Sequence, residues 1–256
     1  MTSPLAGKYP AQPGDGEPQQ ARRLDWPDCQ NTRDLGGLPR PGGLTRMGVL
    51  VRSDSMAHLT ATGREAMSTY GVTTIIDLRS ASEVLTSPNP FANGSGGEVA
   101  YVHLPLIDDS MMVKLGDAID MYGRYLMMLE RRQEAFCDIL NAVAAADGAV
   151  VFHCFAGKDR TGLVAAILLS LAGVAPETIA ADFAETDTQL AKKYQEWLEA
   201  AAPERRKEMR EDLQCPPERM LGVLDHLNEK WGGVAPYLAA SGLDPGTIDR
   251  LSSKLS

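Results

Sequence analysis

One stretch of the sequence constrains the fold more than any other. Residues 149–153 (AVVFH) are apolar and rich in β-branched side chains, residues 154–157 include Gly157, and residues 161–171 are mostly apolar. The first run predicts a buried strand, the glycine permits a tight loop, and the last run predicts a buried helix. A strand that leads into a helix through so short a loop indicates an α/β fold.

The preceding part of the chain shows the same alternation. Apolar runs predict three more strands, at residues 49–52, 72–78 and 99–105. Amphipathic stretches predict a helix at residues 60–70 and a second helical stretch, either continuous or interrupted, at residues 121–146. Ser80 and Glu83 have the spacing of a capping box, and residues 93–97 predict a glycine-rich turn. The sequence therefore predicts a central, mainly parallel sheet flanked by helices.

After Pro176 the pattern predicts helices only. One apolar face at helical spacing consists of Leu190, Tyr194, Trp197, Leu198 and Ala201. Pro203 interrupts this pattern, and two more helices are expected at residues 216–230 and 245–253. A chain of 256 residues, 44% of them hydrophobic, can build one sizeable core, so residues 23–256 are expected to form a single domain. Residues 1–22 are expected to be a disordered tail.

Charge and cysteine content exclude several classes of protein. The net charge of -9 argues against broad nucleic-acid binding, which needs clustered basic side chains. The longest apolar run, residues 163–174, is too short to cross a bilayer, so no stable membrane insertion is expected. The four cysteines form no CxxC pair and are too sparse for a disulfide framework. No metal site is therefore expected, and a reduced, cytoplasmic setting fits best.

Residues 153–162 (HCFAGKDRTG) lie where the predicted strand meets the predicted helix, which is where open α/β sheets bind ligands. A loop wrapped before a helix points N–H groups inward, and the helix dipole favours anions such as a thiolate or a phosphate. Cys154 is a nucleophile once ionised, Arg160 can hold two phosphoryl oxygens, and Thr161 can hydrogen-bond the sulfur. The residues expected to bind substrate are Phe155, Ala156, Gly157, Lys158, Thr161 and Gly162.

These residue types predict a two-step phosphatase reaction. Cys154 attacks phosphorus to form a phosphocysteine while a general acid protonates the leaving oxygen. Water, activated by the same group acting as a base, then hydrolyses the thiophosphate. No metal or cofactor is needed, because the loop and Arg160 neutralise the charge on the transferring phosphoryl group.

The motif has alternatives in other classes of protein. A P-loop nucleotide site is excluded, because Asp159 rather than Ser or Thr follows Lys158 and Phe152 stands where the first glycine belongs. A structural cysteine would not need His153 before it and GKDRTG in and after the loop, and a phosphate-binding module without activity would be expected to lack the cysteine or the arginine. Sulfurtransferase and arsenate reductase chemistries stay open. The first would not need this Thr-Gly pair, and the second needs resolving cysteines, of which Cys137 is the nearest in sequence.

Three further motifs accompany the loop: Asn31-x-Arg33-Asp34-Leu35-Gly36-Gly37, Arg52-Ser53-Asp54 and Ile76-Asp77-Leu78-Arg79-Ser80. With them the chain resembles the cysteine-dependent protein tyrosine phosphatase superfamily, and within it the bacterial branch of the mycobacterial protein tyrosine phosphatase B type. The resemblance spans residues 25–250. It implies hydrolysis of phosphotyrosine, often with activity on phosphoserine, phosphothreonine or phosphoinositides. The expected partners are therefore phosphorylated proteins or phosphoinositides. Export without a conventional signal stays open, as some relatives act outside the cell.

The resemblance places the general acid at Asp159, within the loop. The familiar Trp-Pro-Asp loop is not found at its expected place, since residues 26–28 spell these letters but lie near the tail. Asp77 is the second candidate, against the alternative that it makes a structural hydrogen bond to the loop. The acid must be protonated at the working pH, which requires a raised pKa. His153 is expected to brace the loop rather than act as a base.

The sequence leaves more than one role open for several other residues. Lys158 either adds positive charge that favours highly charged lipid headgroups or points into solvent. The motif at residues 31–34 braces the site, recognises substrate or forms a structural turn, and residues 108–109 either approach the site or are solvated. The apolar face around Trp197 is either core packing or, as the resemblance implies, part of a mobile helical lid around residues 189–215.

Overall fold

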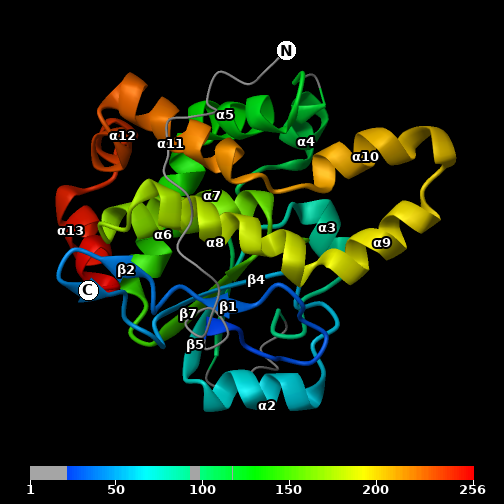
Figure 1. Cartoon of the computed structure of the whole chain (residues 1–256). Helices are drawn as coiled ribbons and strands as arrows, with labels where there is room; N and C mark the ends of the chain where they lie inside the picture. The colour runs from blue at the N-terminus through cyan, green and yellow to red at the C-terminus, as the bar shows by residue number, and fades with distance from the viewer. Residues whose placement is uncertain (1–21, 93–98, 117) are drawn as a thin grey trace.

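The computed structural model describes residues 22–92, 99–116 and 118–256, and its centre is a five-stranded sheet (Figure 1). In spatial order the strands are β1 (Arg33–Asp34), β4 (Leu50–Ser53), β7 (Ala149–His153), β5 (Val72–Asp77) and β6 (Ala100–His103). β1 is antiparallel to β4, and the other neighbours are parallel, which confirms the expected sheet. β2 (Pro39–Arg40) and β3 (Gly43–Leu44) pair separately.

Strand β7 lies in the middle of the sheet because its sequence suits burial on both faces. All five of its residues are buried, as expected for an apolar, β-branched run. β4 and β5 flank it, and Ser53 and Asp77 are both in register with His153. The three parallel strands therefore end at the same level, and the residues that follow them meet at one edge of the sheet.

Helices cover the two faces of the sheet unequally (Figure 1). Val51 and Ile75 contribute to a smaller core beneath α2, whereas Leu50 and Ile76 contribute to a larger core on the other face, as the alternation along a strand requires. The helices are α2 (Ala61–Thr69), α3 (Ala81–Thr86), α4 (Asp109–Leu115), α5 (Met121–Arg131), α6 (Gln133–Ala145), α7 (Asp159–Leu171), α8 (Pro176–Gln189), α9 (Ala191–Ala200), α10 (Arg206–Leu213), α11 (Pro217–Trp231), α12 (Val234–Ala240) and α13 (Pro245–Lys254).

Most predicted elements are found with small shifts. α5 and α6 form the expected helical stretch, which is interrupted at Arg132. The predicted capping box between Ser80 and Glu83 is present at the start of α3. α7 begins at Asp159, two residues before the expected start, so Arg160 also lies in its first turn. The sequence did not indicate α4 and α12, each of which has only seven residues.

Two expectations fall on residues outside the described part of the chain. These are the turn at residues 93–97 and all but the last residue of the expected tail. That last residue, Arg22, is buried against the fold. No helix among the described residues has both the length and the apolar character that crossing a bilayer requires.

Candidate active site

The loop of residues 154–158 joins β7 to α7 where β4, β5 and β7 end. Gly157 has a φ of 65°, in the left-handed region that glycine adopts readily. A Cβ atom there would lie 2.5 Å from the Ser53 carbonyl oxygen, so only glycine fits against the end of β4. Cys154, the first residue of the loop, is 2% exposed. The loop is therefore packed closely against the sheet edge with its thiol buried.

Two side chains hold the loop carbonyls from outside. Asn31 Nδ2 donates to the oxygens of Ala156 and Gly157 at 3.0 and 3.1 Å, and Arg52 Nη2 donates to the Gly157 oxygen at 2.9 Å. Within the described residues, no acceptor is bonded to the backbone N–H groups of residues 155–161. Since the C=O and N–H of a planar trans peptide point in opposite directions, carbonyls held outward turn the N–H groups the other way. The loop is a nest of free donors before a helix, which favours an anion.

Glu83 holds Arg160 beside this nest. Nη1 and Nη2 of Arg160 donate to the two Glu83 oxygens at 2.5 and 2.8 Å. The same carboxylate accepts from the Ser80 N–H at 2.8 Å and so completes the capping box of α3. Burial alone raises the pKa of Glu83, but the hydrogen bonds and charge of Arg160 outweigh burial and lower it. Sequence reasoning identified Glu83 only as a capping residue, because nothing local indicates a partner 77 positions away.

Asp159 follows the loop in the first turn of α7, and Tyr125 of α5 donates to its Oδ1 atom. Burial raises the pKa of Tyr125 well above its ordinary value, so this hydroxyl stays a donor. Within the described part of the chain no hydrogen bond reaches Oδ2, and the Asp159 side chain is 29% exposed. One oxygen of this carboxyl is therefore fixed, and the other is available.

One of the two expectations for Lys158 is that its side chain points into solvent, and the structure shows that it does not. The residue is buried, and Nζ donates to the carbonyl oxygens of Asp212 and Leu213, the latter at 3.2 Å. Both carbonyls belong to the last turn of α10, where an ammonium group is favourable. The lysine therefore tethers α10 to the loop.

His153 and Asp77 lie buried beneath the loop. Asn89 donates to His153 Nε2 at 3.0 Å, which leaves Nδ1 to donate to the Cys154 carbonyl at 3.2 Å. Burial lowers the pKa of His153, and the bond from its Nδ1 atom to the Cys154 carbonyl holds the ring against the start of the loop. Burial alone raises the pKa of Asp77, but the charge that His153 carries when protonated, together with the hydrogen bonds and charge of Arg79, outweighs burial and lowers the pKa to about 2. Asp77 is therefore an ionised carboxylate bonded to Arg79 at Nε and Nη2.

Thr161 and Gly162, the last two residues of the motif, both lie in α7 but behave differently from each other. Thr161 Oγ1 is buried without a partner in the described residues and bonds no sulfur there, so it is free to bond a substrate oxygen. The N–H of Gly162, in contrast, already donates to the Lys158 oxygen at 2.8 Å. A Cβ atom on Gly162 would approach the Phe183 ring to 3.1 Å. Contrary to expectation, Gly162 packs α7 against α8 and takes no part in the nest.

α9 and α10 form a helical hairpin that extends from the body of the molecule (Figure 1). Trp197 of α9 stacks on Phe155 with ring centroids 5.8 Å apart, although Phe155 is still half exposed. Lys193 of α9 lies 3.5 Å from Oδ2 of Asp54, directly after β4. Together with the Lys158 tether, these contacts connect both helices of the hairpin to the loop and its surroundings.

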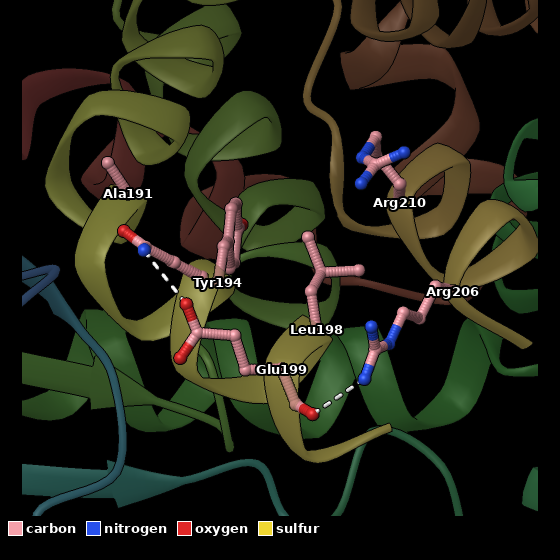
Figure 2. Close-up of a pocket in the computed structure, with 7 residues that line it drawn as sticks. Ala191, Tyr194, Leu198, Glu199, Arg206 and Arg210 are labelled. Atoms are coloured by element: carbon pink, nitrogen blue, oxygen red, sulfur yellow. Dashed lines mark hydrogen bonds between the residues drawn. The ribbon is translucent and has the colours of Figure 1, made fainter. Parts of the chain in front are cut away.

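A groove of about 380 Å³ lies between α9 and α10 (Figure 2). Its lining residues are Ala191, Tyr194, Gln195, Leu198, Glu199, Arg206 and Arg210. Arg206 donates to the carbonyl oxygens of Ala201 and Glu199 at 3.0 Å each, and so holds the end of α9 to the start of α10. The groove includes no residue of the loop at residues 154–158, so it is separate from the candidate active site.

The remaining candidates are structural in this arrangement. Asp34 accepts from the N–H groups of Gly36 and Gly48, and Asp108 caps α4 and pairs with Arg132.

All four cysteines are buried free thiols. Within the described residues, no group of His, Cys, Asp and Glu side chains is arranged to hold a metal ion.

Comparisons with known proteins show which family the chain belongs to. The family model described as "Tyrosine phosphatase family" matches residues 24–256. A protein of Cupriavidus necator, provisionally named a tyrosine-protein phosphatase, is 32% identical over 71% of this chain and 69% of its own. The tyrosine-protein phosphatase of Nostoc commune is 31% identical over 80% of this chain and 73% of its own.

A mycobacterial relative matches over the greatest length of these. The triple specificity protein phosphatase PtpB of Mycobacterium tuberculosis is 27% identical over 90% of this chain and 97% of its own. Among solved structures, that of Pseudomonas aeruginosa TpbA has a TM-score of 0.34 and 20% identity over 54% of this chain and 68% of its own, which is too remote to bear on the site. The family match, which covers nearly the whole described chain, decides the assignment: this chain belongs to the tyrosine phosphatase family.

Proposed function

We propose that this phosphatase hydrolyses phosphotyrosine through a covalent phosphocysteine on Cys154. The observation that carries the proposal is the nest of free N–H groups in the loop, with the thiol at its start and Arg160 held beside it. The Cys154 thiolate attacks phosphorus, the S–P bond forms, and the bond from phosphorus to the tyrosine oxygen breaks. The N–H groups and Arg160 stabilise the charge on the three equatorial oxygens.

We further propose Asp159 as the general acid and base. Tyr125 fixes one carboxyl oxygen, and the other is available to give a proton to the leaving oxygen. In the second step the same oxygen takes a proton from water, which attacks phosphorus and releases Cys154 and inorganic phosphate. Asp77 does not suit this role, because its pKa of about 2 and its bonds to Arg79 keep it ionised. Cys154, Arg160 and Asp159 are thus the proposed catalytic residues.

The proposed range of substrates extends beyond phosphotyrosine to phosphoserine, phosphothreonine and phosphoinositides. The support is the similarity over nearly full length to a relative named a triple specificity phosphatase. Lys158 supplies charge for a phosphoinositide headgroup only after its hydrogen bonds to α10 break.

The four free thiols suit a reducing compartment such as the cytoplasm, where Cys154 stays reduced.

α9 and α10 are proposed as a lid within a single domain of residues 23–256. They contact the loop through the stacked pair Phe155 and Trp197 and through Lys158, and neither contact belongs to the main core. Hydrogen exchange tests this proposal. The amides of α9 and α10 should exchange much faster than those of α7, and protection equal to that of α7 would show that the hairpin is a fixed part of the fold.

The function is tested by phosphate release from four substrates without added metal: p-nitrophenyl phosphate, a phosphotyrosine peptide, a phosphoserine peptide and phosphoinositide vesicles. Wild type should turn over the phosphotyrosine peptide under reducing conditions, and Cys154→Ser should be inactive on all four. A wild type that binds phosphopeptide but turns over none of the four would support a phosphate-binding module instead. The ranking of the other three substrates decides the proposed breadth.

A further inference from the structure

A cluster of buried charges lies behind the loop, on the side away from the free N–H groups. Asp182 of α8 accepts from Arg33 Nε at 3.1 Å and from Arg52 Nη1 at 2.6 Å, and it also pairs with Arg22. All four side chains are buried. Burying charges is costly even when they are paired, and an apolar cluster of the same volume is often as stable. The cluster therefore calls for a role besides stability.

The first connection from Asp182 to the loop is Arg52, which we call the Arg52 arm. Its Nη1 donates to Asp182 Oδ2 at 2.6 Å, and its Nη2 donates to the carbonyl oxygen of Gly157 at 2.9 Å. Because a guanidinium group is planar and rigid, fixing one nitrogen fixes the direction of the other. The carboxylate thus sets the position of a loop carbonyl through one side chain.

The second connection, the Asn31 arm, runs through Arg33. Arg33 Nε donates to Asp182 Oδ1, and its Nη1 donates to Asn31 Oδ1 at 2.5 Å. Because Arg33 can only donate, it turns the amide oxygen of Asn31 toward itself and leaves the Nδ2 group for the loop. Nδ2 then donates to the carbonyl oxygens of Ala156 and Gly157. Both arms begin at one carboxylate and end on adjacent peptide units.

We propose that Asp182 is a positioning residue for phosphoryl transfer. Through the Arg52 and Asn31 arms it holds the two loop carbonyls outward, so that the N–H groups of Gly157 and Lys158 face the transferring phosphoryl group. The inference rests on the proposed function, because it assigns these N–H groups to that phosphoryl group. Asp182 itself touches no substrate. It acts at a distance by keeping the donors aligned before the substrate binds, which is what electrostatic stabilisation of a transition state requires.

The size of the effect follows from what misaligned donors cost. Loss of one oxyanion donor typically lowers kcat by about 10²-fold or more. Partial misalignment of two donors should therefore lower kcat by roughly 10-fold to 100-fold, and it should weaken binding of free oxyanions as well. A role confined to folding predicts a lower melting temperature with unchanged kcat and unchanged oxyanion affinity in the folded enzyme.

The test replaces Asp182 by asparagine, which keeps its shape and removes its charge. Asp182→Asn should bind orthovanadate and inorganic phosphate at least about 10-fold more weakly and should lose more in kcat than in KM, with circular dichroism like that of wild type. Glu185→Gln, on the same helix, is the matched control. Glu185 lies 2.9 Å from Arg22 and 3.3 Å from Arg33. Arg33 nevertheless makes its hydrogen bonds to Asp182, Asn31 and Thr186 and not to Glu185, so both arms stay bonded and vanadate affinity should stay within about 2-fold.

Two milder variants serve if Asp182→Asn does not fold. Asn31→Ala removes the end of one arm, and Arg52→Lys removes the second N–H of the other while keeping a charge near Asp182. Each should weaken vanadate binding and lower kcat, and the pair together should lower both further. Folded variants with wild-type vanadate affinity and kcat would overturn the inference and leave the cluster as an anchor for the N-terminal segment. If wild-type activity depends on Cys154 and Asp182→Asn has the kcat and vanadate affinity of wild type, only this inference is overturned. If wild type is inactive, the proposed function is overturned too.

Discussion

Glu83 caps helix α3 and at the same time holds Arg160, with both terminal guanidinium nitrogens within 2.8 Å of its oxygens. One carboxylate therefore connects the start of a short surface helix to the arginine that we propose binds phosphate. A bidentate pair of this kind also fixes the plane of the guanidinium group. The orientation in which Arg160 meets a phosphoryl group thus depends on where α3 begins.

Replacing Glu83 by glutamine tests this connection. Glutamine also serves in a capping box, so α3 should stay folded while the charge on Arg160 loses its partner. A hydrogen bond to a charged group is worth roughly 1.5–3 kcal/mol, so kcat/KM should fall by roughly tenfold or more. Steady-state kinetics on a phosphotyrosine peptide measure this, with Glu83→Ala as the variant that loses cap and charge together. Unchanged kcat/KM in Glu83→Gln would mean that Arg160 is positioned by other contacts.

Replacing Asp159 by asparagine tests the general acid. A phosphotyrosine leaving group needs a proton, whereas p-nitrophenolate is stable without one. Asp159→Asn should therefore lower kcat on the phosphotyrosine peptide by about 10²-fold or more and on p-nitrophenyl phosphate by much less. Asp77→Asn is the comparison, and it should show no such dependence on the leaving group. Equal losses on both substrates in Asp159→Asn would assign the proton to another residue.

The ionised Asp77 carboxylate should make the free energy of unfolding depend on pH in a specific way. Its pKa in the folded protein is about 2, below the ordinary value of 3.8, so its charge stabilises the fold above pH 4 and this contribution is lost as the pH falls toward 2. The contribution is roughly 2 kcal/mol, since one pKa unit corresponds to about 1.4 kcal/mol. Denaturant unfolding should show a difference between wild type and Asp77→Asn that is full at pH 6 and shrinks below pH 4. A difference independent of pH would contradict the ionised pair with Arg79.

The structure leaves no room for a Cβ atom at position 157, so replacing Gly157 by alanine should disturb the loop. Alanine there would have a positive φ and would place Cβ 2.5 Å from the Ser53 oxygen. The strain should cost at least about 2 kcal/mol or displace the loop, so Gly157→Ala should lose activity and melt at a lower temperature. Gly42→Ala is a useful comparison, because its φ is also positive, at 87°, while nothing lies within 4 Å of the added atom. Similar behaviour of the two variants would show that contact with β4 is unimportant.

Much of the fold and the centre of the site could be predicted from local sequence. The run AVVFH, the glycine in the loop and the apolar helix behind it determine β7, the loop and α7 largely through residues that are adjacent in the chain. Ser80 and Glu83 likewise determine the start of α3 over three positions. Local signals of this kind survive folding because the same short-range sterics and hydrogen bonds operate in the finished structure.

The parts that could not be predicted depend on long-range packing. No local pattern marks Asp182, because its contacts with Arg33 and Arg52 join residues 149 and 130 positions apart. Lys158 is expected in solvent or near substrate, but its partners lie on α10, 54 and 55 positions along the chain. Neither pairing leaves a periodicity or a spacing in the sequence.

Trapping the reaction intermediate shows whether the phosphoryl group is carried on Cys154. Wild type and Cys154→Ser would each be mixed with a phosphotyrosine peptide, quenched in acid within the first turnover and examined by mass spectrometry. We expect wild type to carry one phosphoryl group on the peptide that contains Cys154, and Cys154→Ser to carry none and release no phosphate. A phosphorylated residue elsewhere, or turnover by Cys154→Ser, would show that Cys154 is not the nucleophile.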